Sequence, residues 1–330
     1  MSRSTVALAL TLGTFAAQGT AAHAVEDFTT PRSLGMGDGL RADATGGLGP
    51  LLNPAAMVLR RSYSLEAAYG FRIQDTGSNL LASIVDSVTS RVAAGFYYAY
   101  VHGSPHLSIG GPGGGYAGST PADVTREGHE TGLALALPIG DHVSIGVTTK
   151  YLHIATIATI PTFDPKTGMT TSQAITLDST TSSASADGFT MDVGLGLRLG
   201  ESFSLGLVGY NLVPLRSREA PIGIGTGIAY KVATAFTAAF DVAVDFNKYK
   251  DRGTGNDLVT VRLGGGMEYL AGGKVALRAG ASWDQGRPGA FIGCGIAYVG
   301  TSFALDLGYR QQASGGHDST LIGGLRVFLE

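Results

Sequence analysis

The residues that could carry out chemistry are scattered along the chain and form no known catalytic motif. A zinc hydrolase would need H-E-x-x-H, and a serine hydrolase would hold its nucleophile in G-x-S-x-G. Neither motif occurs, and five of the histidines lie far apart, at His102, His106, His129, His142 and His153. A serine and a histidine on adjacent strands could still meet, so a hydrolase stays open as an alternative. The sequence predicts no catalytic residue, no metal ligand and no cofactor, and we do not expect an enzyme.

Three further features favour no chemistry. The glycine-rich stretch 110–116 resembles a phosphate-binding loop only in its glycines, because it lacks the Gly-Lys-Ser/Thr ending. We interpret it as a flexible loop. The single cysteine, Cys294, excludes an internal disulfide framework. The net charge of −3 gives no sign of a nucleic-acid partner.

The N-terminus is typical of a secretory signal peptide. Arg3 is followed by an apolar stretch from Thr5 to Ala17, and Ala22-His23-Ala24 fits the small-residue rule for cleavage. A membrane anchor is the alternative, but the apolar stretch is short and no stop-transfer charges follow it. We therefore expect residues 1–24 to be removed after export through the Sec pathway.

The composition of the remaining chain favours β-structure in a membrane. No apolar run approaches the roughly 20 residues that a spanning helix needs. Charged residues make up 15% of the chain, against about 25% in an average soluble domain, and glycine contributes 50 of 330 residues. Barrels and secreted β-structures remain as candidates.

Alternation with a period of two runs through most of the chain after residue 61. In the clearest segment, 236–246, three phenylalanines lie on one face, whereas Asp241 and Asp245 lie on the other. The segment 303–310 repeats the pattern, with Asp306 and Arg310 opposite an apolar face. A helix would mix the two sets, but a strand separates them. One apolar and one polar face is what lipid and the lumen of a barrel require.

The connections between strands sort by length. We expect about fourteen strands, at 62–72, 78–87, 91–102, 129–137, 142–153, 188–199, 202–211, 222–230, 233–246, 257–269, 273–282, 289–299, 301–310 and 318–329. Connections after even-numbered strands are short. Those after odd-numbered strands are mostly longer, notably 103–128, 154–187 and 247–256. Outer-membrane barrels have short periplasmic turns and longer external loops. The sequence therefore predicts an all-β transmembrane barrel of about fourteen antiparallel strands, with both ends in the periplasm.

Aromatic and glycine residues add two expectations. Aromatics near strand ends could form interfacial girdles: Tyr69, Phe71, Tyr98, Tyr100, Tyr151, Tyr210, Tyr230, Tyr269, Trp283, Tyr298 and Tyr309. Glycines inside strands would permit bends and close contact with something in the lumen: Gly194, Gly196, Gly206, Gly264, Gly265, Gly266, Gly293 and Gly295. Because fourteen strands enclose more space than their own side chains fill, the barrel needs a plug or forms a pore.

Residues 25–61 precede the barrel and do not read as strand. Asn53 before Pro54 predicts the start of a short helix, with asparagine as N-cap and proline in the first position. A flexible linker and a plug folded into the lumen are both compatible with this segment. We favour the plug, which gives three parts: signal peptide 1–24, hatch 25–61 and barrel 62–330.

Three motifs in this segment resemble the N-terminal signature of the FadL-like outer-membrane proteins, including the PorV/PorQ branch. They are Leu34-Gly35-Met36-Gly37, Ala42-Asp43-Ala44 and Asn53-Pro54-Ala55. The resemblance spans about thirty residues and implies a fourteen-stranded barrel with an N-terminal hatch. In the transporter branch it implies uptake of long-chain fatty acids or other hydrophobic compounds. The chain departs from the pattern in its short length and in ending Phe328-Leu329-Glu330.

Two functions follow as hypotheses. The first is passive transport of a hydrophobic small molecule across the outer membrane. Hatch residues would line or gate the path, although packing of the plug is the favoured role of each: Leu34, Gly35, Met36, Gly37, Leu40, Leu51, Leu52, Asn53, Pro54, Ala55 and Met57. The second is a PorV-like partner in protein secretion or surface attachment, which would hold a secreted or surface protein with its external loops. A structural barrel without cargo is a third. Outer-membrane lipids are expected partners in each case.

Overall fold

The structure is a computed structural model that describes residues 28–59, 61–73, 76–104, 106–109, 120–164, 169–177, 185–215, 217, 219–233, 235–250, 256–286, 289–314 and 318–329. The predicted signal peptide and the glycine-rich stretch 110–116 lie outside these residues. No helix of the described part is long and apolar enough to cross a membrane.

Sixteen strands follow four short helices in the described chain. The helices are α1 (Pro31–Gly35), η2 (Gly46–Leu48), α2 (Gly49–Leu52) and η3 (Pro54–Val58). The strands are β1 (Tyr63–Arg72), β2 (Ser78–Asp86), β3 (Ala93–Gly103), β4 (His106–Ile109), β5 (Thr120–Ile139), β6 (Val143–Asp164), β7 (Met169–Leu177), β8 (Ala186–Leu199), β9 (Phe203–Tyr210), β10 (Gly223–Val232), β11 (Phe236–Lys250), β12 (Asp257–Ala271), β13 (Val275–Asp284), β14 (Gly289–Val299), β15 (Phe303–Gln312) and β16 (Ser319–Leu329).

Fourteen of these strands close into a ring. Each pairs antiparallel with its neighbours, β1 pairs with β16, and β5 pairs directly with β6, so that β4 and β7 are left outside the ring. The predicted strand number is therefore confirmed. The closure has a physical reason, because an open sheet would expose unpaired N–H and C=O groups to hydrocarbon.

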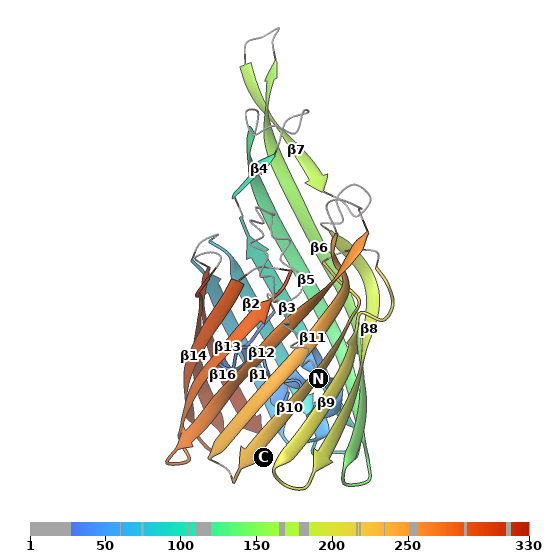
Figure 1. Cartoon of the computed structure of the whole chain (residues 1–330), viewed down its shortest axis with the longest axis vertical. Coiled ribbons are helices and arrows are strands. Elements are labelled where there is room, and N and C mark those ends of the chain that lie inside the picture. The colour runs from blue at the N-terminus through green and yellow to red at the C-terminus, as the bar shows by residue number, and fades with distance from the viewer. Residues whose placement is uncertain are drawn as a thin grey trace, which may run out of the picture.

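The two longest predicted loops were wrong in part. Residues 103–128 and 154–187 were expected to be irregular, but β5 and β6 extend to 20 and 22 residues. The short strands β4 and β7 pair with the outer sides of these extensions. Figure 1 shows the resulting four-stranded sheet rising above the rest of the barrel. The alternation signal marks strands by their lipid-facing side, and an extension beyond the membrane has none.

The short and long connections lie at opposite ends of the barrel, as predicted. Residues 87–92, 140–142, 200–202, 233–235, 272–274 and 300–302 make the short turns, and both ends of the ring, Tyr63 and Leu329, lie with them. We call this the short-turn end and its opposite the long-loop end. The β9–β10 connection folds inward, since Glu219 and Ala220 are buried and Glu219 pairs with Arg126 on β5 at 2.7 Å.

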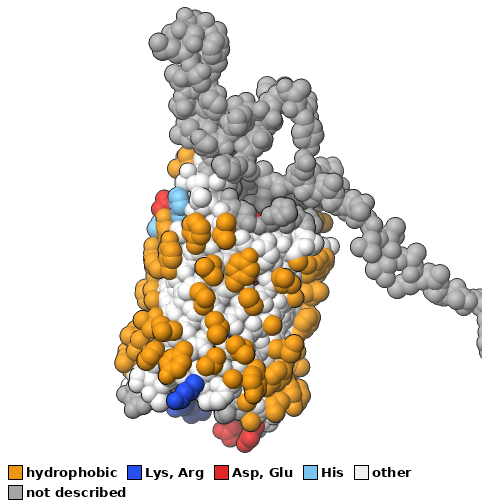
Figure 2. All heavy atoms as spheres, turned by 90° about the vertical axis from the view of Figure 1, so that its left-hand side faces the viewer, with side chains coloured by type: hydrophobic (Ala, Val, Ile, Leu, Met, Phe, Trp, Pro, Cys, Tyr) orange, Lys and Arg blue, Asp and Glu red, His pale blue; other side chains and the backbone are white. Residues whose placement is uncertain are grey.

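The two faces of each strand are chemically distinct. In β11, Phe240 and Phe246 are exposed on the outer wall, whereas Asp241 and Asp245 are buried inside. Figure 2 shows hydrophobic side chains spread over the wall, with charged groups near its ends. Because lipid rather than water surrounds such a wall, exposed leucine and phenylalanine are stable there. This pattern confirms the alternation seen in the sequence.

Outward aromatics pair across strands near the barrel ends. Phe203 contacts Tyr230 with ring centroids 4.6 Å apart, and Tyr151 contacts Phe189 at 5.1 Å. Tyr210 was expected among these outward aromatics. That prediction is wrong, because the Tyr210 side chain points into the lumen and bonds to Arg41. Gly206, Val208 and Tyr210 are spaced two residues apart on β9 and therefore share the inward face of the strand.

The outer wall should reject charge at mid-height and tolerate it at the turns. Ile228 lies near the middle of β10 and is 42% exposed, whereas Val88 is 53% exposed in a short turn. We expect Ile228→Arg to lower the free energy of unfolding by roughly 2–4 kcal/mol, and Val88→Arg to leave it nearly unchanged. Urea unfolding in lipid vesicles measures both. Equal losses would contradict a membrane-spanning wall.

Candidate functional site

Residues 28–59 lie inside the barrel, and we call them the internal segment. Its short helices begin at capped positions: Thr30 accepts from the Ser33 amide, and the Asn53 side chain accepts from the Ala55 amide at 3.2 Å. The expected start at Asn53-Pro54 is thus confirmed, although the helix that follows is a 3-10 helix. In Figure 1 the segment occupies the space between the strands.

Glycines let the internal segment lie directly on the barrel wall. A Cβ added at Gly39 would come within 2.7 Å of the Gly265 Cα on β12, and one at Gly266 equally close to the Met36 Cα. Gly37 adopts a φ of +62°, which disfavours other residues, and faces the backbone of Ala281. The predicted close contact of strand glycines with the lumen content is confirmed for Gly194, Gly206, Gly264, Gly266 and Gly293.

Most predicted hatch residues serve packing. Leu34, Met36, Leu40 and Met57 are at most 1% exposed and belong to apolar clusters with strand residues. Ala55 lies against Gly146, and Asn53 donates to the Arg41 carbonyl at 3.0 Å. Gly35 and Pro54 likewise contact the wall glycines Gly295 and Gly146. Among the predicted hatch residues, Gly37, Leu51 and Leu52 line the cavity described below. Their role toward a ligand stays a prediction.

A chain of alternating charges joins the internal segment to the wall on its short-turn side. Arg32 donates to Asp43 at 2.8 Å and to Glu268 at 3.0 Å. The chain continues from Glu268 through Arg278 to Asp306 on β15, each step at 2.6–2.7 Å. Burial alone would lower the pKa of Arg32, but its carboxylate partners outweigh burial and hold that pKa above the ordinary value. Arg32 therefore stays charged.

Below this chain lies a lower vestibule of about 900 Å³, bounded by the short turns and by Arg32, Arg278 and Arg326. On the other side of the internal segment lies the upper cavity, of about 150 Å³. Asn211 and Pro221 of the inward-folded β9–β10 connection help to line it, which places it toward the long-loop end. The internal segment thus separates two spaces of different size and chemistry.

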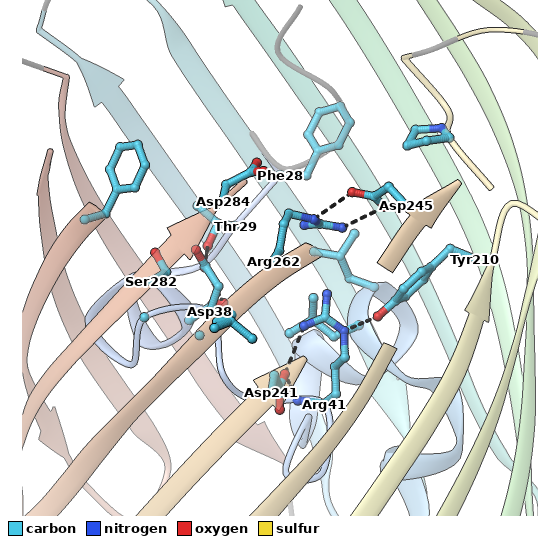
Figure 3. A pocket seen from close by; sticks show the side chains of 18 of the residues that line it. Phe28, Thr29, Asp38, Arg41, Tyr210, Asp241, Asp245, Arg262, Ser282 and Asp284 are labelled. Atoms are coloured by element: carbon cyan, nitrogen blue, oxygen red, sulfur yellow. Dashed lines mark hydrogen bonds and ion pairs between the residues drawn. The ribbon is translucent and has the colours of Figure 1, made fainter. Parts of the chain in front are cut away.

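The upper cavity combines apolar surface with ion pairs. Phe28, Leu51, Leu52 and Phe291 contribute the apolar part. Figure 3 shows the charged groups facing inward from several strands. Arg41 bonds through its amide and guanidinium to Asp241 at 2.8 and 3.0 Å and contacts the Tyr210 hydroxyl.

Two further arginines line the same cavity. Arg262 holds Asp245 with two hydrogen bonds of 2.9 and 3.2 Å. Arg310 donates one bond of 3.1 Å to Asp38. Sequence reasoning placed Asp241, Asp245 and Arg310 on inward faces but did not join them into a site, because Asp241 and Arg310 pair with residues of the internal segment that lie 200 and 272 positions away.

Solved structures share this fold, whereas sequence comparison finds nothing: no protein-family model and no curated protein matches the chain. The CymD monoaromatic hydrocarbon channel is 15% identical, with a TM-score of 0.66 over 91% of this chain and 97% of that chain. The toluene transporter TbuX of Ralstonia pickettii is 13% identical, with a TM-score of 0.67 over 92% and 98%. A FadL homologue of Pseudomonas aeruginosa is 11% identical, with a TM-score of 0.63 over 91% and 98%.

At these identities the likeness establishes the fold. The chain shares the barrel fold of these proteins, as the motifs around Leu34 and Asn53 implied.

The contact between segment and wall should be intolerant of a single methyl group. Gly266→Ala would place its Cβ 2.7 Å from the Met36 Cα, whereas nothing lies within 4 Å of a Cβ at Gly323. Neither glycine has a positive φ, so the two substitutions are matched. We expect Gly266→Ala to cost about 1–3 kcal/mol of stability through overpacking, and Gly323→Ala to cost little. Equal urea midpoints in lipid vesicles would contradict the contact.

Proposed function

We propose that this chain is an outer-membrane channel for the passive entry of small hydrophobic molecules. The observation that carries the proposal is the upper cavity, a partly apolar space of about 150 Å³ at the long-loop end of a closed barrel. An apolar solute is held back by the polar outer surface of the membrane and needs a protein path with an apolar site. The monoaromatic hydrocarbon channel and toluene transporter that share the fold support this reading.

We further propose that the internal segment acts as a plug. It fills the space between the upper cavity and the lower vestibule, and its apolar clusters and charge chain bind it to strands on several sides. Of its residues, Leu51 and Leu52 line the cavity and are the best candidates for contact with a solute. The plug would correspond to the predicted hatch 25–61.

Location and export complete the proposal. The lipid-facing wall supports contact with outer-membrane lipids, and export through the Sec pathway would bring the chain there. A PorV-like role in secretion is less well supported, because the fold neighbours named above are hydrocarbon transporters.

Filling the cavity should slow uptake. We expect Leu52→Trp to reduce entry of radiolabelled toluene or oleate into cells that lack other such channels, because the larger ring occupies the space that a solute needs. Leu65→Trp, on the outer wall where Leu65 is 40% exposed, is the matched control. If cells with the unaltered protein take up no more solute than cells without it, the transport proposal is refuted.

A further inference from the structure

The walls of the upper cavity carry charged groups beside the apolar ones. Four cationic side chains line it, and each has a carboxylate partner: Arg41, Lys150, Arg262 and Arg310. Water that occupies such a cavity bonds to these groups. An apolar solute that displaces this water cannot replace those bonds, so it binds weakly. A solute with a group that accepts hydrogen bonds recovers part of the loss.

Arg310 is the group with donors to spare. A guanidinium carries five N–H donors, and in the described part of the chain its one hydrogen bond goes to Asp38. By contrast, Arg262 commits two donors to Asp245. The Arg310 side chain is only 14% exposed, so its remaining donors face a confined space that includes the upper cavity.

The surroundings of Arg310 hold it in one place. Its guanidinium carbon lies 5.3 Å from the centre of the Phe291 ring, a cation–π distance. Its partner Asp38 has a φ of 60° and is fixed by the Ser33 hydroxyl at 2.9 Å. Asp38 is itself 37% exposed, so the pair is open on one side. The pair therefore holds the Arg310 guanidinium in a defined position beside the cavity.

The size of the cavity limits the rest of the solute. About 150 Å³ is below the roughly 300–1,000 Å³ of pockets for drug-sized ligands, and a cavity of that size holds a single ring. Phe28, Phe291 and Leu51 supply apolar walls for such a ring. The space therefore fits one ring or a short chain with one polar substituent.

We propose that the upper cavity selects small apolar molecules that carry one oxygen acceptor, a carboxylate or a hydroxyl, and that Arg310 recognises this oxygen. The inference rests on the proposed transport function and narrows its substrate class. It differs from a preference for plain hydrocarbons or for long chains.

The test is an isothermal calorimetric titration of the full chain in detergent with toluene, benzyl alcohol and benzoate, which share a ring and differ in oxygen. We expect the oxygen-bearing compounds to bind about ten-fold more tightly or better, as a hydrogen bond to a charged donor allows. Arg310→Met should remove this preference, whereas Lys274→Met, in a short turn, should keep it.

Asp38→Asn tests whether Arg310 recognises the oxygen of the solute or serves only to pair with Asp38. Asparagine tolerates the same backbone conformation, and it leaves Arg310 free, so the preference for benzoate should persist or increase. Equal weakening of all three compounds by Asp38→Asn and Arg310→Met would assign the pair to packing and overturn the inference. Toluene binding as tightly as benzoate to the unaltered protein would also overturn it. Failure of all three compounds to bind, together with wild-type uptake equal to that of cells without the protein, would instead refute the transport function.

Discussion

Backbone pairing in hydrocarbon is the constraint on which this structure depends. A strand in lipid has no water to satisfy its N–H and C=O groups, so the sheet must close, as it does where β1 meets β16. Closure with fourteen strands leaves a space that inward side chains cannot fill. The protein fills that space with its own N-terminus. Because the N-terminal segment does not fill the space completely, cavities remain beside it, and the ion pairs and the proposed site lie around them.

Two different physical devices join the filling to the wall. Toward the middle, glycine meets backbone, as Gly39 does at Gly265, and the gain is close packing without side-chain entropy. On the short-turn side, buried charges alternate from Arg32 to Asp306. Such pairs contribute little net stability because desolvation offsets their attraction, but they penalise any position that leaves one charge unpaired. The glycines allow contact, and the charges fix its register.

The sequence predicts the wall of the barrel better than the site inside it. Alternation in β11 separates Phe240 from Asp241 because one side of a strand meets lipid, and that difference is local. The parity of turn lengths is local too. The site is not: Arg41 meets Asp241, and Asp38 meets Arg310, across most of the chain. The extensions of β5 and β6 escaped prediction because strands outside the membrane have no lipid face to mark them. The glycines inside the strands were the advance sign of close contact in the lumen.

The pairing of Arg32 with Glu268, 236 residues later, also bears on how the molecule is made. The internal segment is synthesised before every strand, yet its partners on β12, β13 and β15 are among the last to emerge. Contacts this distant in sequence form late and slowly. Once β1 and β16 have joined, the wall offers no seam through which 32 residues could pass (28–59). Closing the barrel and seating its content are therefore coupled, because the last strands to emerge complete both.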